Sequence, residues 1–405
     1  MIIIAGFSRS HLLATIGSLS ERKVNVFGVS AIAPKRNFLR LGKYYIFGSD
    51  RLEYRRQLMG DAPVKQVRLA EFLFQVAVRI SNPNSNVCYK LLSGISFRLF
   101  SQAAYSYSRK IDANYEATLL IRSGFGSAFG LDCRKFVSDA SLPHPNVLQS
   151  LIETGEMHFK EIDPNDKISR LILEDTNRAD VLLVNSDFVK KTFVFAGVNE
   201  KKIVVAYLPP TGHFKNVINL PKKEIRPTSR SFRILFAGTL EERKGVTEIL
   251  KVAEMALHAS LNFEFIFIGR WGKETNHLEA KLKCLINCRV ESWKSQANLA
   301  RAMEHSDVFL FPSRAEGGAR VVTEAMCIGM PIITTHNSGT PINHLLEGII
   351  VKPLDHDSIY YWLNRLYTDV SLRKKLASSS KNKIKKMIKE DLYLKTILEI
   401  CCNTK

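Results

Sequence analysis

The chain of 405 residues lacks a long hydrophobic run, and no apolar stretch approaches the roughly 18 residues that a membrane-spanning helix needs. Its start, MIIIAGF, also lacks the charged beginning and cleavage site of a secretory signal and is typical of a buried first strand. Seven cysteines form no paired CxxC framework, which favours reduced thiols over disulfides. We therefore expect a cytoplasmic protein without a membrane span.

Acidic residues are scarce relative to basic ones. The chain has 58 Lys and Arg against 39 Asp and Glu, a net charge of +19. Residues 35–110 hold 14 basic residues against four acidic ones, and residues 371–395 hold nine against two. Such patches attract an anionic membrane surface, as on the inner face of the cell membrane, or a phosphate-bearing acceptor. No helix-turn-helix, zinc-finger or aromatic RNA-binding motif accompanies them, so we expect no nucleic acid partner.

Short β-rich runs alternate with helical stretches along the chain, a pattern typical of parallel sheets with crossover helices. A polar stretch with Pro221 and Pro227 fits neither a strand nor a strong helix. Because this length suits two domains better than one, we predict a first domain over residues 1–215, a linker over 216–230 and a second domain over 231–390. The predicted fold class is α/β, with two Rossmann-like, doubly wound domains.

The expected elements follow from hydrophobic periodicity and from capping residues. The expected strands are residues 2–5, 24–29, 117–121, 135–138, 181–184 and 203–206 in the first domain, and 233–238, 263–269, 308–311, 331–335 and 348–351 in the second. The expected helices include residues 53–80, 89–110, 186–197, 246–258 and 296–306.

Two glutamates, Glu316 and Glu324, stand in the stretch SDVFLFPSRAEGGARVVTEAMCIGMPII. A turn with Gly317 and Gly318 is expected to open a helix near Gly318, with Glu324 about two turns further in. Bare backbone N–H groups at the positive end of that helix form a seat for a pyrophosphate. The two carboxylates stand about 12 Å apart along the axis, a span that suits a nucleotide sugar. The stretch predicts a clamp for a sugar donor.

A second segment, ILFAGTLEERKGVTEIL, places cations beside another helix start. A strand is expected to end at Gly238, and Arg243 and Lys244 come just before a helix. Two cations in that position stabilise the charge that grows on a departing diphosphate. Arg243 and Lys244 are therefore candidate catalytic residues.

Together these segments resemble the retaining nucleotide-sugar glycosyltransferases of family 4, two-domain enzymes with the GT-B fold. The family pattern runs Glu-Gly-Phe-Gly, then four residues and Glu-Ala-Met, then Gly and a strand-opening Pro. The matching residues here are Glu316, Gly317, Glu324, Ala325, Met326, Gly329 and Pro331, with Gly318 in place of the aromatic residue and Ala319 in place of the second Gly. The resemblance covers most of residues 180–355, and the first 130 residues only by architecture.

The resemblance implies roles for single residues. In the family the first Glu contacts the transferred sugar and the second contacts the ribose, which implies these roles for Glu316 and Glu324. The donor diphosphate lies against the turn that here holds Gly317, Gly318 and Ala319.

The second segment departs from the family at one position. The family usually has Gly-Arg-Leu at the strand end, and here Thr239 follows Gly238 in place of the Arg. Lys244 matches the family's Lys-Gly. We therefore expect Arg243 to supply the missing phosphate cation, with Arg320 on the facing helix as a second candidate.

Three further positions come from the loops that follow strands. His144 lies between Pro143 and Pro145, where related enzymes hold a His near a hydroxyl of the donor sugar, and a neutral imidazole suits that contact. Gly6 is a candidate for the loop that faces the donor from the first domain. Gly269 is a candidate for the border of the nucleotide base.

The resemblance implies a retaining hexosyltransferase that acts on a saccharide or lipid-linked saccharide, with a last helix over residues 391–405 that returns to the first domain. The expected setting is cell-surface polysaccharide biosynthesis. A sugar-nucleotide epimerase of the same fold and a non-catalytic basic binding protein remain alternatives. We expect no cofactor and no metal. The DHD sequence at Asp355 resembles a metal-binding motif, but it precedes a helix, and we expect Asp357 to be its N-cap.

Overall fold

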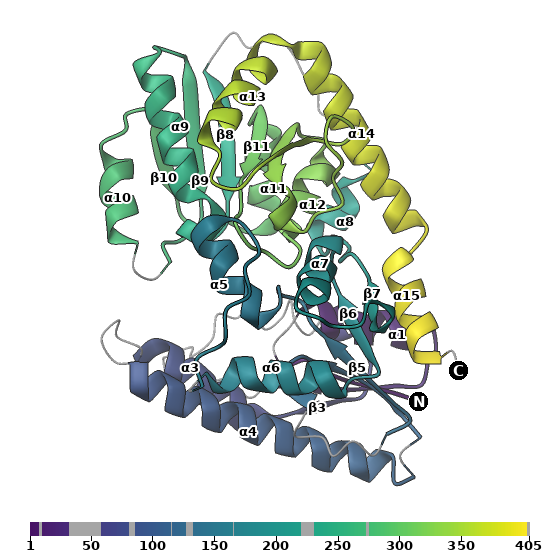
Figure 1. Cartoon of the computed structure of the whole chain (residues 1–405). Coiled ribbons are helices and arrows are strands. Elements are labelled where there is room, and N and C mark those ends of the chain that lie inside the picture. The colour runs from purple at the N-terminus through teal and green to yellow at the C-terminus, as the bar shows by residue number, and fades with distance from the viewer. Residues whose placement is uncertain are drawn as a thin grey trace, which may run out of the picture.

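The computed structural model describes residues 1–7, 10–31, 58–80, 86–114, 116–126, 133–164, 166–219, 231–272 and 275–402. Two lobes lie one above the other, and each is built around a parallel sheet with helices beside it (Figure 1). The prediction of two Rossmann-like parallel units is confirmed. Residues 220–230 of the expected linker lie outside the described residues.

The first sheet has seven strands in the order β3-β2-β1-β4-β5-β6-β7, and every pairing is parallel. Its chain runs from β1 outward to β3 and then crosses to β4 on the other side of β1. This change of direction makes the carboxyl ends of β1 and β4 the switch point, where doubly wound sheets bind ligands. The strands are β1 (Ile2–Ala5), β2 (Val26–Ser30), β3 (Val64–Gln66), β4 (Thr118–Arg122), β5 (Lys135–Asp139), β6 (Val181–Val184) and β7 (Ile203–Val205).

The second sheet has six strands in the order β10-β9-β8-β11-β12-β13, again all parallel. Its switch point lies between β8 and β11. The strands are β8 (Phe232–Ala237), β9 (Phe263–Ile268), β10 (Cys288–Glu291), β11 (Val308–Phe311), β12 (Ile332–Thr335) and β13 (Ile349–Val351).

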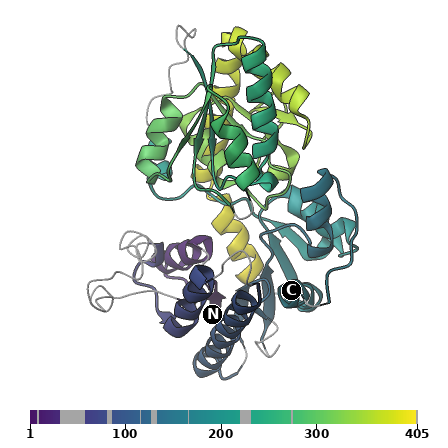
Figure 2. The ribbon, with the colours of Figure 1, turned by 90° about the vertical axis from the view of Figure 1, so that its left-hand side faces the viewer.

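Helices connect the strands and cover the sheets (Figures 1 and 2). Those of the first half are α1 (Ser10–Glu21), α3 (Arg68–Ile80), α4 (Asn86–Ile111), α5 (Pro145–Thr154), α6 (Lys167–Arg178), α7 (Asp187–Phe195) and η2 (Glu200–Lys202). Helix α8 (His213–Val217) runs into the expected linker and packs against α11 and α12 of the second half. Those of the second half are η3 (Glu242–Lys244), α9 (Val246–His258), α10 (Asn276–Lys283), α11 (Gln296–Glu304), α12 (Arg320–Ile328), η4 (His336–Ser338), α13 (His356–Thr368), α14 (Val370–Lys389) and α15 (Leu392–Cys402).

Three expectations differ from the structure. Strand β3 lies inside the segment expected as a helix over residues 53–80, because the chain is extended after Pro63 and pairs with β2 before α3 begins. Strand β10 was not expected, because its sequence CRVE carries little apolar periodicity. The N-cap of α13 is Asp355 and not Asp357, since the Asp355 carboxylate accepts the backbone N–H of Ser358 at 2.9 Å.

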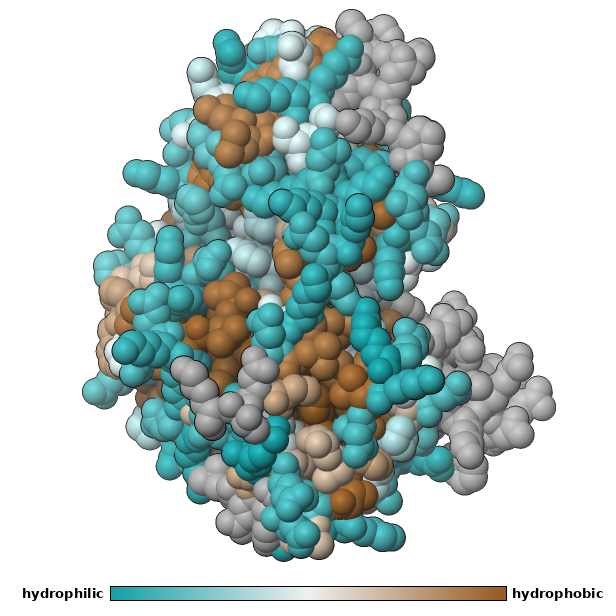
Figure 3. Space-filling model, turned by 90° about the vertical axis from the view of Figure 1, so that its right-hand side faces the viewer, coloured by the Kyte–Doolittle hydropathy of each residue, from teal (hydrophilic) through white to brown (hydrophobic). Residues whose placement is uncertain are grey.

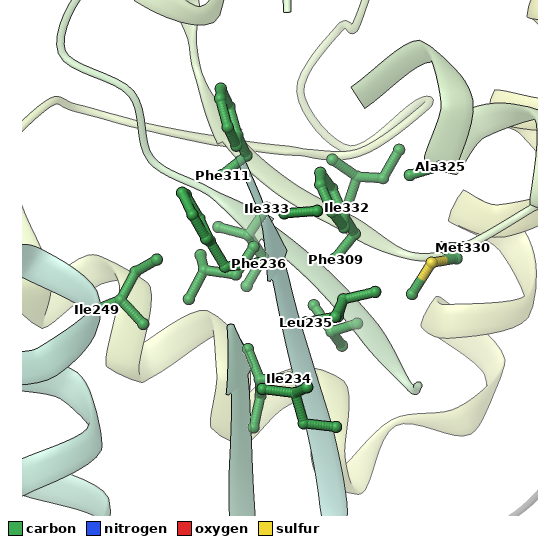
Figure 4. Close-up of a cluster of buried hydrophobic side chains, with 14 of the residues drawn as sticks. Ile234, Leu235, Phe236, Ile249, Phe309, Phe311, Ala325, Met330, Ile332 and Ile333 are labelled. Carbon is green, nitrogen blue, oxygen red and sulfur yellow. The ribbon is translucent and has the colours of Figure 1, made fainter. Parts of the chain in front are cut away.

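A buried core in the second half fixes where its strands end. Phe236 on β8 stacks on Phe311 of β11, with ring centroids 5.6 Å apart (Figure 4). Ile249, Ala325 and Ile332 bring α9, α12 and β12 into the same core. The last residues of β8 and β11 are therefore held rigidly, as are the loops that follow them.

The last helix returns to the first half, as expected. The Thr118 hydroxyl and the Arg134 guanidinium both donate to the Cys401 carbonyl, at 3.1 and 2.9 Å. At the other end of α15 the Tyr393 hydroxyl lies 3.1 Å from the Thr15 hydroxyl on α1. In Figures 1 and 2 this yellow helix lies against the lower lobe.

The helical surface is mixed in character. From the side of α14 and α15, Figure 3 shows mostly hydrophilic residues in the upper half and brown apolar patches around the middle of the molecule. Within the described part of the chain, none of the helices combines the length and the apolar character that crossing a membrane requires.

Candidate functional site

One carboxylate binds the two predicted catalytic cations. Glu316 Oε1 accepts hydrogen bonds from Lys244 Nζ at 2.6 Å and from Arg243 Nη1 at 2.9 Å. Arg243 also donates to Glu241 at 2.7 Å and to the Ala315 carbonyl at 2.7 Å. Burial tends to lower the pKa of Arg243, but Glu316 and Glu241 outweigh burial and raise it. The two cations and the two carboxylates therefore balance one another in charge.

Local backbone geometry places these cations. They end the short helix η3, and Gly245 then adopts a φ of +79° before α9 starts. A Cβ at Gly245 would lie 2.2 Å from the Pro312 carbonyl, so only glycine lets η3 lie against the end of β11. The Arg314 N–H then donates to the Arg243 carbonyl at 2.8 Å, which joins the two predicted segments.

The turn after β11 leads into α12 without a side-chain cap. Helix α12 starts at Arg320, two residues later than expected, and Ala319 is its N-cap. The Glu316 and Ala319 N–H groups donate to the Asn337 and Ser338 carbonyls at 2.8 and 2.9 Å, which fixes the turn. A helix start without a side-chain cap is a suitable place for an anion.

Glu324 lies just over one turn into α12, not two, because the helix starts later than expected. The residue as a whole is half-buried. Burial raises its pKa to about 7, and the charge of Arg320 opposes that rise. Glu324 therefore changes charge near neutral pH, and Arg320 lies close enough to affect it.

Gly238 and Gly269 follow the neighbouring strands β8 and β9 and lie in contact. A Cβ at Gly269 would be 1.8 Å from the Gly238 carbonyl oxygen, and one at Gly238 would be 3.6 Å from Lys244 Cδ. Both glycines therefore border the cation pair at the carboxyl edge of the sheet. Among the described residues, no hydrogen bond or ion pair joins Thr239 or the first-domain residue Gly6 to this network.

His144 is the N-cap of α5 in the first domain and is buried. Its Nδ1 accepts the Asn146 N–H at 3.3 Å, and its ring lies edge-on to Phe193. Burial lowers its pKa to about 4, so the imidazole is neutral at neutral pH. Because Nδ1 is an acceptor, the proton lies on Nε2, where it is available to a hydroxyl.

The two halves meet at the glycine turn. The Ser186 hydroxyl donates to the Gly317 carbonyl at 2.5 Å. A Cβ at Gly317 would lie 1.8 Å from the Ser141 carbonyl oxygen, three residues before His144 in the chain. The loop that holds His144 therefore touches the turn that holds Glu316.

Sequence reasoning missed two residues that join the halves. The buried Arg314 pairs with Glu248 at 2.6 Å and donates to the Ile152 carbonyl in α5 at 3.1 Å. Asn337 donates to the carbonyl of Gly155, the C-cap of α5, at 2.9 Å. Both therefore position the helix that begins at His144. The available signal for Arg314 was an arginine three residues after a buried strand.

Comparison with known proteins adds a family to this geometry. The family model described as "Glycosyl transferases group 1" matches residues 219–383. An amylovoran biosynthesis glycosyltransferase of Erwinia amylovora is 29% identical over 33% of this chain and 35% of its own length. A lipopolysaccharide 1,2-N-acetylglucosaminetransferase of Salmonella typhimurium is 20% identical over 77% of this chain and 87% of its own length.

The whole chain also matches solved structures. The HepE protein of Anabaena, solved in complex with UDP, superimposes with a TM-score of 0.61 at 15% identity, over 97% of this chain and 99% of that one. This likeness confirms the predicted GT-B fold. The first three curated relatives share 35% to 56% of their own length with the chain.

The contact at Gly317 predicts that adding a single methyl group at this residue would push the two halves apart. In Gly317→Ala the new Cβ overlaps the Ser141 carbonyl, so we expect a loss of about 1–3 kcal/mol of unfolding free energy and a larger radius of gyration. Gly318→Ala is the matched control, because its Cβ meets nothing closer than 3.4 Å. Denaturant unfolding and small-angle X-ray scattering check this. Equal behaviour of the two variants contradicts the close approach of Gly317 to Ser141.

Proposed function

Because the chain belongs to the group 1 glycosyltransferases of family 4, we propose that it moves a hexose-type sugar from a nucleotide-diphosphate donor to a hydroxyl group, with retention at the anomeric carbon. The observation that carries this proposal is the Glu316 carboxylate, held by Lys244 and Arg243 beside the uncapped start of α12. That arrangement places a carboxylate that can bind a sugar next to a helix start that can bind an anion.

The donor diphosphate binds between the start of α12 and the cation pair. The positive end of the helix dipole and the charges of Arg243 and Lys244 stabilise it. Gly317 and Gly318 let the first half approach this turn closely, and Arg320 at the first helical position is a further cation. Glu324 accepts the ribose hydroxyls, and Gly238 and Gly269 border the base.

Donor binding changes the partners of the cations. Without donor, Glu316 neutralises Lys244 and is itself only 13% exposed. A diphosphate brings two negative charges and competes for the Lys244 ammonium. Lys244 then turns toward the phosphate, and the released oxygen of Glu316 accepts a sugar hydroxyl.

The reaction is a same-face displacement. The acceptor oxygen forms a bond to the anomeric carbon, the bond from that carbon to the diphosphate oxygen breaks, and the departing phosphate takes the acceptor proton. Lys244 and Arg243 stabilise the charge on the leaving diphosphate. His144 donates a hydrogen bond from Nε2–H to a hydroxyl of the donor sugar.

The two halves divide these tasks. We propose that residues 1–215 hold the acceptor, that 216–230 form the linker, that 231–390 hold the donor and that 391–405 return to the first half. Relatives named for amylovoran and lipopolysaccharide synthesis support a saccharide or lipid-linked saccharide acceptor in cell-surface polysaccharide biosynthesis.

The direct test is a thermal-shift screen with UDP-, GDP- and ADP-sugars, followed by analysis of the product linkage. In Glu316→Gln we expect transfer to fall by about 100- to 1,000-fold, the size of loss seen when one transition-state contact is removed. Glu304→Gln, on the exposed end of α11, is the matched control and keeps full activity. An inverted product linkage rules out the mechanism, and conversion of the donor alone to its epimer identifies the epimerase alternative.

Glu324 gives the donor affinity a pH dependence. Its carboxyl, with a pKa of about 7, accepts ribose hydroxyls more strongly when ionised, so we expect the affinity for an intact UDP-sugar to rise as pH increases through about 7. The diphosphate of a UDP-sugar does not titrate near pH 7, so a pH dependence of the affinity in that range comes from the protein. Calorimetric titration at several pH values measures this rise, and Glu324→Gln removes it. A dependence that survives in Glu324→Gln belongs to another group.

We also propose that α3 and α4 dock on an anionic lipid surface, the inner leaflet of the cell membrane. The two helices pack side by side along the lower edge of Figure 1. Leu69 and Leu91 are 57% and 61% exposed, and Phe72 and Ile95 are also exposed. The Ser96 hydroxyl donates to the Ala70 carbonyl, which joins the two helices beside Ile95 and Leu69.

The charge of this face suits such lipids. Arg68 and Arg98 are exposed among the apolar residues, and α4 contains no acidic residue. The one acidic residue of α3, Glu71, is buried. Apolar side chains ringed by cations bind the interface of anionic membranes.

Flotation with vesicles checks the lipid contact. We expect the protein to float with phosphatidylglycerol vesicles and not with phosphatidylcholine vesicles, and high salt to weaken binding. Leu69→Ser with Phe72→Ser should weaken binding by about tenfold or more, because two apolar side chains no longer insert. Ile286→Ser with Trp293→Ser, exposed residues of the second half, is the control. Equal flotation of both double variants excludes this face.

A further inference from the structure

A buried histidine and a buried aspartate form a pair in the first half that the proposed reaction does not yet use. His11 Nε2 lies 3.0 Å from Asp139 Oδ2, and the two residues are 6% and 4% exposed. His11 is in the first turn of α1, and Asp139 is the last residue of β5. The residues are far apart in sequence, so only the fold brings them together.

The pair lies at the switch point of the first sheet. Helix α1 follows β1, β4 is the neighbour of β1, and Asp139 pairs in register with Arg122 at the carboxyl end of β4. His11 and Asp139 therefore meet above the end of β4, where doubly wound sheets place their ligands.

The same region faces the glycine turn of the second half. Asp139 is two residues before Ser141, whose carbonyl abuts Gly317. The Tyr393 phenol, which bonds Thr15 of α1, has a pKa raised by burial and by the charge of Asp139, and lowered by the charge of Arg320. Asp139 of the first half and Arg320 of the donor seat thus act on one phenol.

The hydrogen bond also sets the proton of the imidazole. In the neutral imidazole, the Asp139 carboxylate accepts from Nε2–H, and Nδ1 then carries a lone pair. In the part of the chain that the structure describes, no hydrogen bond is made to His11 Nδ1. A lone pair backed by a carboxylate repels an anionic phosphate and accepts a neutral hydroxyl.

We infer that His11 Nδ1 binds a hydroxyl of the acceptor saccharide, and that Asp139 is a positioning residue that holds its tautomer. This inference rests on the proposed glycosyl transfer. The bound hydroxyl is a neighbour of the attacking one, which keeps its proton for the departing phosphate. A donor-sugar hydroxyl has the same chemistry, and kinetics separates the two sources.

Two amide substitutions separate the two nitrogens of His11. In His11→Gln the amide reaches the place of Nε2 and keeps the bond to Asp139, but the acceptor at Nδ1 is lost. In His11→Asn the amide oxygen stands at the place of Nδ1, and the bond to Asp139 is lost. A subsite predicts that Gln impairs acceptor binding and that Asn impairs stability, whereas a purely structural pair leaves the kinetics of His11→Gln unchanged.

The experiment uses the full chain with the donor from the thermal-shift screen. Glycerol and the octyl glycosides of glucose, galactose and N-acetylglucosamine serve as acceptor probes. We expect His11→Gln to raise the KM for the acceptor by about tenfold or more, the effect of one lost hydrogen bond beside a charged partner. The KM for the donor, measured from donor hydrolysis, and the melting temperature should stay unchanged.

Three outcomes overturn the inference. The first is an unchanged acceptor KM in His11→Gln, and the second is an equal rise in the donor KM. The third is a wild-type enzyme that hydrolyses a donor but glycosylates none of the probes. In that case the proposed use of a nucleotide-sugar donor is retained, and the acceptor subsite at His11 is rejected. If the protein binds no nucleotide sugar at all, the proposed function itself is rejected.

Discussion

The pairing of Glu316 with Lys244 and Arg243 is the interaction on which the candidate site depends. It joins the turn after β8 to the turn after β11. The two neighbouring strands must therefore end level with each other at the carboxyl edge of the sheet. Those ends are held by the aromatic core, in which Phe236 stacks on Phe311. The charges are partly buried and balanced, so removal of one partner leaves an uncompensated charge where solvation is poor.

A second constraint is the close approach of the two halves at Gly317. The first half reaches this turn through Ser141 and Ser186, and the second half reaches back to α5 through Arg314 and Asn337. Contacts in both directions hold His144, at the start of α5, near the donor turn. Since the diphosphate is proposed to bind at the same turn, binding and domain closure are coupled through a few backbone atoms.

Electrostatics then distinguishes the two sides of the junction. The second half offers helix N–H groups and cations, which suit a diphosphate. The first half offers a neutral His144 and the buried His11–Asp139 pair, which suit sugar hydroxyls. The exposed apolar and basic face of α3 and α4 belongs to the first half as well. A lipid-linked acceptor that reaches the protein from this face would therefore contact the first half before the second.

The sequence by itself determined the class of the protein and most of its regular structure. Helix α9 and strand β11 have the bounds that periodicity predicted, because both are long or apolar enough to be decided locally. Spacing within single segments also predicted Glu316, Lys244 and the glycine turn. Short, weakly apolar strands such as β3 and β10 were missed, since their pairing with a neighbouring strand leaves no periodic signal in so few residues. Only the tertiary structure decided that Glu316 binds both cations, that Arg314 and Asn337 hold α5, and that His11 meets Asp139. These partners are far apart in sequence. They meet because the ends of separate strands lie side by side in the sheet, and local sequence patterns do not encode such a contact.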